Sequence, residues 1–272
     1  MEKISLEILM MVKSMKVLIT GAASGIGRKV AEVLVERGHF VYLTVHRPIE
    51  LQKVQREIKS KNMKCLLLDI TKEEERRRLL SLDIDCLINH AGIGYSGSLL
   101  TMPFSHLRDN FEVNFFASFA LIQLLLPQLL EKEKGKIIIV SSLAGILPIP
   151  FLGSYCSSKA AISMFAKCFR QELKFTKSKL QVCLIEPGIY NTGFNDYMLE
   201  NKEETYFTKP YFSEPELLQS RMKQLFWLFG KNHYHSIVKQ YVKAVEAKKM
   251  RKVYRAPFLS RIGMKLYLLF MG

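Results

Sequence analysis

Tyr155 and Lys159 are residues whose types and spacing could do acid–base chemistry. On a helix, residues four positions apart lie on one face, so the phenol and the ammonium would point the same way. A free phenol has a pKa of about 10, and a nearby cation favours the phenolate and lowers that pKa. The pair is therefore a candidate general acid and base, although on most helices this spacing joins a core aromatic residue to a solvated charge.

A glycine-rich turn far upstream of Tyr155 could bind a phosphate-containing ligand that takes part in that chemistry. Residues 16–20 predict a short buried strand that runs into Gly21, Gly25 and Gly27, and a helical pattern then continues to Gly38. Glycines allow a tight turn, and backbone N–H groups at the start of such a helix can bind a pyrophosphate. The pattern by itself also occurs in ordinary turns between a strand and a helix.

Further motifs, in order along most of the chain, resemble those of the short-chain dehydrogenase/reductase family. They are the glycine turn, Asp69–Thr71, Asn89–Gly92 and Pro187–Thr192. The resemblance also implies four catalytic residues, which are Asn114, Ser142, Tyr155 and Lys159. The predicted cofactor-binding residues come from these motifs and from the end of the second predicted strand. They are Gly21, Ser24, Gly25, Ile26, Gly27, His46, Arg47, Asp69, Ile70, Asn89, Ala91, Gly92, Tyr155, Lys159, Pro187, Gly188, Ile189 and Thr192.

The resemblance implies hydride transfer between a nicotinamide cofactor and a carbonyl or alcohol carbon. Tyr155 would exchange the proton, Ser142 would hydrogen-bond the reacting oxygen, and Lys159 would lower the pKa of Tyr155. Asn114 would support a proton relay through water. Ser142 is favoured over its neighbour Ser141 because it lies thirteen residues before Tyr155, the separation that the resemblance favours.

His90 departs from the family pattern inside these motifs, because a small residue is more usual there. One interpretation is that its side chain crowds or hydrogen-bonds a group near the cofactor. The other is a tolerated substitution at the end of a strand. We favour the second as the simpler interpretation.

The end of the second predicted strand bears on the choice of cofactor. In dinucleotide-binding folds a residue about 20 positions past the glycines contacts the adenosine ribose, and an acid there favours NAD. Residues 40–45 lead instead to His46 and Arg47, whose planar guanidinium suits a phosphate. NADP(H) is therefore favoured and NAD(H) is the alternative, since Ser24 occupies the other position that is often basic and Arg47 could be a surface residue.

Length and element order indicate a single α/β domain. A chain of 272 residues is a usual size for one such fold. Apolar strands alternate with helical patterns, which favours a Rossmann-like, doubly wound parallel sheet of six to seven strands with helices on both faces. We expect an N-terminal extension at 1–14 and the domain at 15–256. The strand candidates are 16–20, 40–45, 64–68, 85–89, 136–140 and 181–185, with an edge strand at 252–255.

The cysteines indicate a reducing compartment. All five lack Cys-x-x-Cys spacing and most fall in apolar patterns, as reduced thiols do.

No histidine or carboxylate cluster has convincing metal-ligand spacing, so no metal site is expected. Residues 1–14 are too short to span a bilayer and lack a small-residue cleavage site. We therefore expect a cytoplasmic protein, with peripheral contact at a membrane surface as an option.

Apolar residues surround the predicted catalytic group, and the predicted substrate contacts are Ser142, Leu143, Tyr155 and Phe194. The wall before Tyr155 consists of Leu143, Ile146, Leu147, Ile149, Phe151 and Leu152. A lid at about 193–230 adds Phe194, Tyr197, Met198, Tyr206, Phe207, Tyr211, Phe212, Phe226, Trp227 and Phe229. Such a lining suits a bulky apolar substrate, which could be steroid-, retinoid- or lipid-like. The alternative is that these side chains fill the core and a subunit interface.

Positive charge is concentrated near the C-terminus. Residues 221–272 hold twelve Lys or Arg and one acid, Glu246, in a chain of net charge +15. The basic and apolar segment 257–272 could bind anionic lipid as an interfacial helix. Docking of this segment on the domain or on a partner subunit is slightly favoured over lipid binding. Nucleic acid is not an expected partner.

Assembly and the class of function complete the expectations. The family usually assembles through helices near 103–130 and 155–175, which implies a homodimer or tetramer acting on a small-molecule carbonyl or alcohol. A non-catalytic NADP-binding sensor or regulator is the alternative function, because a fold alone does not set function. The complete set of four catalytic residues favours the enzyme.

Overall fold

The computed structural model describes residues 14–200, 220–221, 223–224, 227–257 and 263. Most of three predicted segments therefore lies outside the described residues. These segments are the extension at 1–14, the middle of the lid and the C-terminal segment 257–272. The lid residues Tyr206, Phe207, Tyr211, Phe212 and Phe226 are among those not described.

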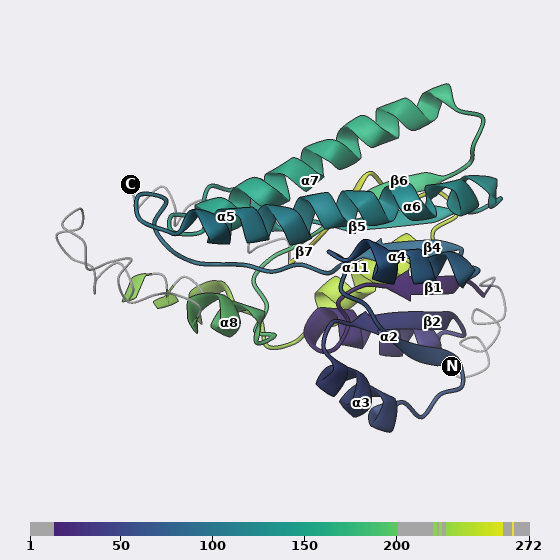
Figure 1. Cartoon of the computed structure of the whole chain (residues 1–272), viewed down its shortest axis with the longest axis horizontal. Coiled ribbons are helices and arrows are strands. Elements are labelled where there is room, and N and C mark those ends of the chain that lie inside the picture. Colours follow the sequence, from purple (N-terminus) through teal and green to yellow (C-terminus); the bar gives the residue numbers. More distant parts are fainter. Residues whose placement is uncertain (1–13, 201–219, 222, 225–226, 258–262, 264–272) are drawn as a thin grey trace.

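Parallel strands form one seven-stranded sheet in the order β3-β2-β1-β4-β5-β6-β7 (Figure 1). This arrangement confirms the predicted doubly wound sheet, and the candidate at 252–255 is its edge strand. The sixth strand runs two residues beyond its predicted end. The bounds are β1 (Lys16–Ile19), β2 (Phe40–Val45), β3 (Met63–Leu67), β4 (Cys86–Asn89), β5 (Lys136–Val140), β6 (Gln181–Pro187) and β7 (Val253–Ala256).

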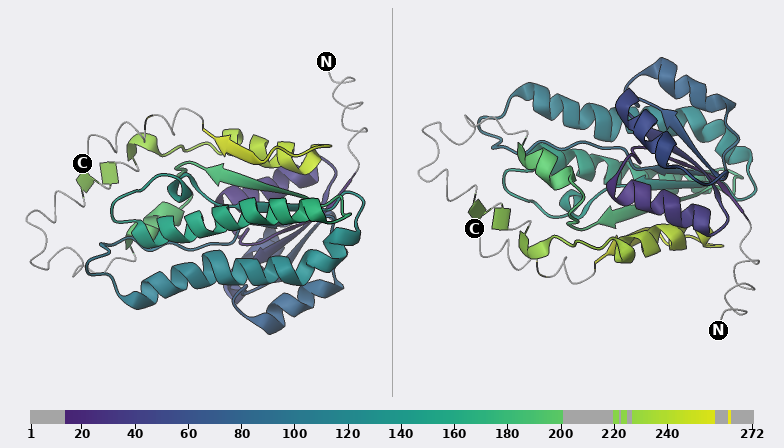
Figure 2. Two further views of the ribbon diagram at one scale, coloured as in Figure 1. Left: turned by 90° about the horizontal axis from the view of Figure 1, so that it is seen from above. Right: turned by 90° about the horizontal axis from the view of Figure 1, so that it is seen from below.

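Helices cover both faces of the sheet (Figure 1 and Figure 2). The longer ones are α2 (Gly25–Glu36), α3 (Pro48–Glu57), α5 (Phe104–Phe111), α6 (Ser118–Glu131), α7 (Gly153–Glu172) and α11 (His235–Glu246). The shorter ones are α4 (Glu73–Arg77), α8 (Phe194–Glu200) and single turns at Arg78–Ser81, Leu143–Gly145 and Leu173–Phe175. A wider, π-helical turn, η2 (Glu112–Ala117), joins α5 to α6.

Successive strand residues point to opposite faces and meet different helices. Val17 and Ile19 of β1 pack in the cluster that includes α2 and α11, whereas Leu18 packs in the cluster of α6 and α7. The same alternation runs through β4, β5 and β6. The continuous run from Phe104 to Glu131 is apolar and long enough to cross a membrane by composition alone, but its Leu121 is fully buried in the core against the sheet.

The strand order reverses between β1 and β4, which are neighbours in the sheet. At such a point the loops at the carboxyl ends of the strands separate and leave a crevice. The glycine turn follows β1, Asn89–Gly92 ends and follows β4, and Ser142 follows β5. The topology therefore brings these motifs to one edge of the sheet.

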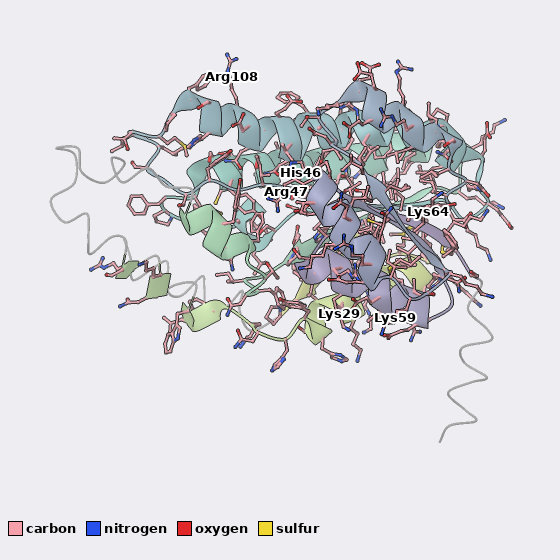
Figure 3. The ribbon with its side chains drawn as sticks, turned by 60° about the horizontal axis from the view of Figure 1, so that its bottom comes forward. Lys29, His46, Arg47, Lys59, Lys64 and Arg108 are labelled. Atoms are coloured by element: carbon pink, nitrogen blue, oxygen red, sulfur yellow. The ribbon has the colours of Figure 1, made fainter. Side chains whose placement is uncertain are left out.

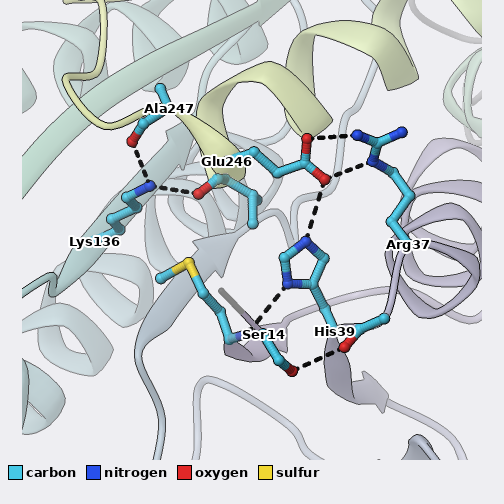
Figure 4. Close-up of polar contacts among 9 residues, drawn as sticks. Ser14, Arg37, His39, Lys136, Glu246 and Ala247 are labelled. Atoms are coloured by element: carbon cyan, nitrogen blue, oxygen red, sulfur yellow. Dashed lines mark hydrogen bonds and ion pairs between the residues drawn. The ribbon is translucent and has the colours of Figure 1, made fainter. Parts of the chain in front are cut away.

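The C-terminal end of α11 is held by side chains from distant parts of the chain (Figure 4). Arg37 donates from Nη2 to the Glu246 carboxylate at 2.7 Å, and Nε2 of His39 lies 3.3 Å from the same carboxylate. The buried Lys136 of β5 donates to the carbonyl oxygen of Val245 and, at 2.8 Å, to that of Ala247. These contacts fix α11 against the sheet and α2.

Candidate active site

A cavity of about 790 Å³ lies at the carboxyl edge of the sheet. It extends from the loops after β2 and β3 to α8. Most of the predicted site residues line it, and these are Gly21, Ser24, Gly25, Ile26, His46, Arg47, Asp69, Ile70, Ala91, Gly92, Ser142, Leu143, Tyr155, Lys159, Pro187, Gly188, Ile189, Thr192 and Phe194.

Three predicted residues lie behind the cavity wall instead. Asn114 and Asn89 are both buried, and the Asn89 side chain donates to the carbonyl of Ser118 at 3.0 Å. Gly27 lies in the first turn of α2, where a Cβ would come within 3.1 Å of the Cα of Ala22. Asn89 and Gly27 do not line the cavity and pack against protein, so their contact with the cofactor stays a prediction.

The turn after β1 requires glycine at two positions. Gly21 and Gly25 have φ angles of +65° and +59°, which residues with a Cβ rarely adopt. A Cβ on Gly21 would also lie 2.8 Å from the Cα of Ala91. Ser24, between these glycines, lines the cavity and makes no capping hydrogen bond to α2. Its hydroxyl and the first N–H groups of α2 can therefore bind an anion.

Thr20 joins the glycine turn to the end of β4. Its Oγ1 accepts hydrogen bonds from the backbone N–H groups of His90 and Ala91, each at 2.9 Å. This role of Thr20 was not predicted from the sequence. Its place at the end of an apolar strand, directly before a glycine turn, was the available signal, because a buried hydroxyl needs partners.

Tyr155, Ser142 and Lys159 lie together at the other end of the cavity. The Nζ atom of Lys159 is 5.8 Å from the centroid of the Tyr155 ring and donates to the carbonyl of Val140 at 3.2 Å. Burial lowers the pKa of Lys159 to about 8. Helix α7 and the loop after β5 therefore place a phenol, a hydroxyl and a cation around one space.

The pKa of Tyr155 differs from the sequence-based expectation, in which Lys159 lowers it. Burial raises the pKa of Tyr155 to about 12, and a hydrogen bond with the Ser142 side chain opposes the rise. Lys159 lies beside the ring and bonds to Val140 rather than to the phenol. The phenol therefore keeps its proton near neutral pH, which is the form that can donate to a carbonyl oxygen.

The two neighbouring serines have different surroundings. Ser141 is buried, donates to the carbonyl of Lys159 at 2.9 Å and accepts from the Ser163 hydroxyl at 2.7 Å. Ser142 is half-buried, and its hydroxyl accepts from the N–H of Ala144 at 3.1 Å and hydrogen-bonds Tyr155. The geometry supports Ser142 as the residue that faces substrate and Ser141 as the one that holds α7.

Asn114 lies in the wide turn η2 and holds the segment after β4 that carries Gly92. Its side chain donates to the carbonyl of Ile93 at 2.9 Å and to the Ser158 hydroxyl at 3.0 Å, and it accepts from the N–H of Ile93 at 2.9 Å. A Cβ on Gly92 would meet Oδ1 of Asn114 at 2.9 Å and Nζ of Lys159 at 3.1 Å. Asn114 is therefore close to Lys159, and the water relay between them stays a prediction.

The adenosine end of the cavity contains an acid, Glu50, that was not predicted from the sequence. Figure 3 shows His46 and Arg47 where β2 leads into α3. Arg47 donates from Nε and Nη2 to one oxygen of Glu50, at 2.9 and 2.6 Å, and its backbone N–H lies 3.2 Å from the other oxygen. Partial burial alone would raise the pKa of Glu50, but the hydrogen bonds from Arg47 lower it. The signal for this contact was the spacing of the two residues, because an acid three positions after the N-cap residue, here Glu50 after Arg47, often bonds back to that residue.

Asp69 is held rigidly at the same end. Its carboxylate accepts from the N–H and the hydroxyl of Thr71 at 3.0 and 2.7 Å, and its own N–H donates to Glu75 at 2.7 Å. Burial works against ionisation of Asp69, yet these bonds from Thr71 bring its pKa below the ordinary value. The carboxylate is therefore charged near neutral pH and can accept hydrogen bonds from a ligand.

The substrate end is apolar, although three residues of the predicted wall do not line it. Leu143, Ile149 and Leu152 line the cavity with Phe194, Tyr197 and Met198 of α8. Ile146 is 41% exposed, and Leu147 and Phe151 pack in the apolar cluster behind the wall. Tyr95 also lines this end and was not predicted, and its ring stacks on His106 with centroids 4.1 Å apart.

These residues fit a dinucleotide. The glycine turn leaves the N-terminus of α2 open beside an uncapped Ser24, and Gly92 leaves space in front of Asn114 and Lys159 that a Cβ would fill. Asp69 and Arg47 could hold the adenosine part, Ser24 and the first turn of α2 the pyrophosphate, and Lys159 the nicotinamide ribose. The cavity lining joins all of these residues.

Comparison with known proteins defines the class. The family model for short chain dehydrogenase matches residues 15–203. A curated relative, the 3-ketodihydrosphingosine reductase of Bacteroides thetaiotaomicron, is 34% identical over 187 residues, which are 66% of this chain and 65% of that protein's length. The chain belongs to the short-chain dehydrogenase/reductase family, whose members are NAD(P)-dependent oxidoreductases acting on CH–OH and C=O groups.

Solved structures share the fold. A short-chain dehydrogenase/reductase from Burkholderia phymatum in complex with NAD has a TM-score of 0.76 and 20% identity, covering 96% of this chain and 95% of its own. The closed form of a serine dehydrogenase complexed with NADP+ has a TM-score of 0.65 and 26% identity, covering 78% and 88%. Both structures confirm the predicted fold, and they hold different nicotinamide cofactors.

Proposed function

We propose that the protein is an NADP(H)-dependent oxidoreductase that interconverts a carbonyl and an alcohol on a bulky apolar substrate. The observation that carries this proposal is the position of Tyr155, Ser142 and Lys159 at the apolar end of the cavity, opposite the glycine turn and Arg47. The acid–base groups and the residues that could bind a dinucleotide line the same cavity. Hydride transfer between a cofactor and a carbonyl carbon needs this arrangement.

Each catalytic residue has a role in carbonyl reduction that follows from its surroundings. A nicotinamide cofactor supplies the hydride. Tyr155, which stays protonated, donates its proton to the carbonyl oxygen of the substrate. Ser142 donates a hydrogen bond to the same oxygen and stabilises the negative charge that develops on it. Lys159, a cation held beside the phenol ring, stabilises the phenolate that remains, and Asn114 holds the strand end next to Lys159.

The preference for NADP(H) rests on charge at the adenosine end. No acid stands directly at the end of β2, where His46 and Arg47 follow Val45 and line the cavity. Arg47 can bind a 2′-phosphate through its planar fork. Glu50 occupies that fork in the structure, so a 2′-phosphate must share or displace the contact. NAD(H), which lacks this phosphate, is the alternative.

The preference for a bulky apolar substrate rests on the lining near Tyr155. The ring of Phe194 lies 5.8 Å from that of Tyr155, centroid to centroid, and Leu143, Ile149 and Met198 complete the wall. A cavity wall made of such side chains favours binding of an apolar ligand. One curated relative is named a 3-ketodihydrosphingosine reductase, and this name supports a lipid-like substrate here.

NADPH oxidation against a series of carbonyls, from small and polar to large and apolar, tests this proposal. We expect activity to rise with apolar size and to be lost in Tyr155→Phe, which removes only the phenol hydroxyl. Tight NADPH binding without turnover of any member of the series would favour the alternative, a non-catalytic sensor or regulator. Activity on small polar carbonyls alone would overturn the apolar substrate.

We also propose a homodimer or tetramer. Leu99, Leu100, Phe104, Phe116 and Met164 are each more than half exposed and lie on or next to α5, η2 and α7. A second copy of the chain that covers these residues would remove them from water. Light scattering on the wild type and on Phe116→Glu tests this, because one charge in such an interface should produce monomers. A cytoplasmic location and contact of residues 257–272 with a membrane stay predictions.

A further inference from the structure

His90 and Tyr241 form a polar pair beside the glycine turn. Nδ1 of His90 lies 2.9 Å from the Tyr241 hydroxyl. His90 follows β4 and lines the cavity, whereas Tyr241 is on α11 and fully buried. The two residues are 151 positions apart, and His90 is the residue that departs from the family's motif. Neither has a role in the hydride-transfer mechanism described above.

Burial decides which atom donates in this pair. Burial and the charge of Lys159 lower the pKa of His90 to about 4, and burial raises the pKa of Tyr241 well above its ordinary value, so both are neutral. A neutral imidazole carries one N–H. If that proton were on Nδ1, the Tyr241 hydroxyl proton would be buried without an acceptor among the described residues, which is costly. The Tyr241 hydroxyl therefore donates to Nδ1, and the ring proton is on Nε2.

His90 lines the cavity, and Nε2–H is the ring donor that its contact with Tyr241 leaves for a ligand there. Among the described residues it has no hydrogen-bond partner, and it is not one of the fully buried polar atoms that lack one. The adjacent ring carbon, Cδ2, lies 3.1 Å from the position that a Cβ on Gly27 would take. Gly27 is in the first turn of α2, where backbone N–H groups favour an anion. The ring donor thus lies next to an anion-binding helix end.

We infer that His90 is a cofactor-binding residue whose Nε2–H donates a hydrogen bond to the pyrophosphate of the dinucleotide, and that Tyr241 positions the ring for it. The inference rests on the proposed function, in which the start of α2 binds that pyrophosphate. A neutral donor adds a contact to the anion without burying a second charge. The lack of a side chain on Gly27 leaves the space that the ring occupies.

Binding measurements with ligand fragments test the contact. ADP-ribose contains the pyrophosphate and lacks the nicotinamide, whereas 2′-AMP contains the adenosine end alone. We expect His90→Ala to weaken ADP-ribose and NADPH by about tenfold and to leave 2′-AMP unchanged. His90→Gln, which keeps an N–H donor, should recover part of the loss. Equal loss for 2′-AMP, or unchanged ADP-ribose affinity, would overturn the inference.

Nitrogen NMR of the histidine ring in the wild-type protein gives an independent answer, even if a variant fails to fold. We expect the ring proton of His90 on Nε2, and a shift of Nε2 but little change at Nδ1 when ADP-ribose is added. Tyr241→Phe should allow both tautomers. A proton on Nδ1 in the free protein, or no response of Nε2 to ADP-ribose, would contradict the assignment. Neither experiment measures turnover, so a failure of the proposed reductase activity would be seen separately.

Discussion

Arg47 and Glu50 form a two-point ion pair at the adenosine end of the cavity, with two guanidinium nitrogens on one carboxylate oxygen at 2.9 and 2.6 Å. Arg47 follows the last residue of β2, and Glu50 lies in the first turn of α3, so the start of the helix sets their separation. Both residues line the cavity. A ligand phosphate at this place would meet an arginine whose charge is already partly neutralised.

Glu50→Gln should therefore increase the preference for NADPH over NADH. Glutamine keeps the hydrogen bond to the backbone of Arg47 but removes the charge that competes with a 2′-phosphate. We expect the ratio of the two dissociation constants to shift by about tenfold toward NADPH. Arg47→Gln is the matched control and should shift the ratio the other way. Fluorescence titration of both cofactors measures it, and an unchanged ratio in both variants would show that neither residue reaches the ribose.

Tyr155→Phe should remove turnover while leaving cofactor binding intact. The phenol hydroxyl is the proton donor in the proposed mechanism, and loss of a general acid typically costs about 10²–10⁴-fold in rate. Single-turnover NADPH oxidation gives the rate, and titration gives the cofactor affinity. A Ser142→Ala variant should lose rate as well, because its hydroxyl bonds Tyr155 and the reacting oxygen. A Tyr155→Phe enzyme with near wild-type turnover would place the proton donor elsewhere.

The rate of reduction should fall as the pH rises through about 8. The pKa of Lys159 is lowered to about 8, so the ammonium that stabilises the phenolate is lost above that pH. Tyr155 does not limit this range, since its pKa is about 12 and it keeps its proton. Lys159→Arg, which holds its charge to a higher pH, should move the decline upward. A flat profile from about pH 7 to about pH 10 would contradict this assignment.

Gly92→Ala should impair catalysis more than stability. Its Cβ would lie 2.9 Å from Oδ1 of Asn114 and 3.1 Å from Nζ of Lys159, so the Asn114 amide must shift and the lysine must give by a few tenths of an ångström. Because misplacement of a catalytic group by about 1 Å can cost on the order of 10²-fold in kcat, this smaller displacement should still lower kcat. Gly38→Ala is a control at a position with no atom within 4 Å. It should lower the melting temperature through its positive φ and leave kcat unchanged.

Glu246→Gln should destabilise the fold at neutral pH by about 2 kcal/mol. Burial alone would raise the pKa of Glu246, but hydrogen bonds from His39 and Arg37 lower it to about 2. A carboxyl whose folded pKa lies below the unfolded value stabilises the fold above that unfolded value and loses the effect on acidification. Urea unfolding at several pH values should therefore show the difference from wild type narrowing below about pH 4.5 and vanishing near pH 2. A difference that does not change with pH would point to packing rather than charge.

Local patterns were sufficient for much of the fold and of the catalytic group. The strand at 136–140 and the glycine turn could be predicted because apolar runs and left-handed glycines are properties of short segments. The family's spacing predicted Tyr155, Ser142 and Lys159, which line one end of the cavity. Asn89 and Gly27 belong to the same motifs but are outside the cavity lining, because motif membership does not distinguish a residue in the wall from one behind it.

The amino-acid sequence by itself determined the order of strands and helices and singled out the candidate acid–base pair, because both depend on neighbours a few positions apart. Only the tertiary structure decided the protonation of Tyr155, since its pKa depends on burial by residues from several elements. The pairing of His90 with Tyr241 depended on it as well, because β4 and α11 meet only when the sheet is complete. The surroundings of a side chain depend on how helices and strands pack, and packing brings together residues whose separation in the sequence follows no fixed spacing.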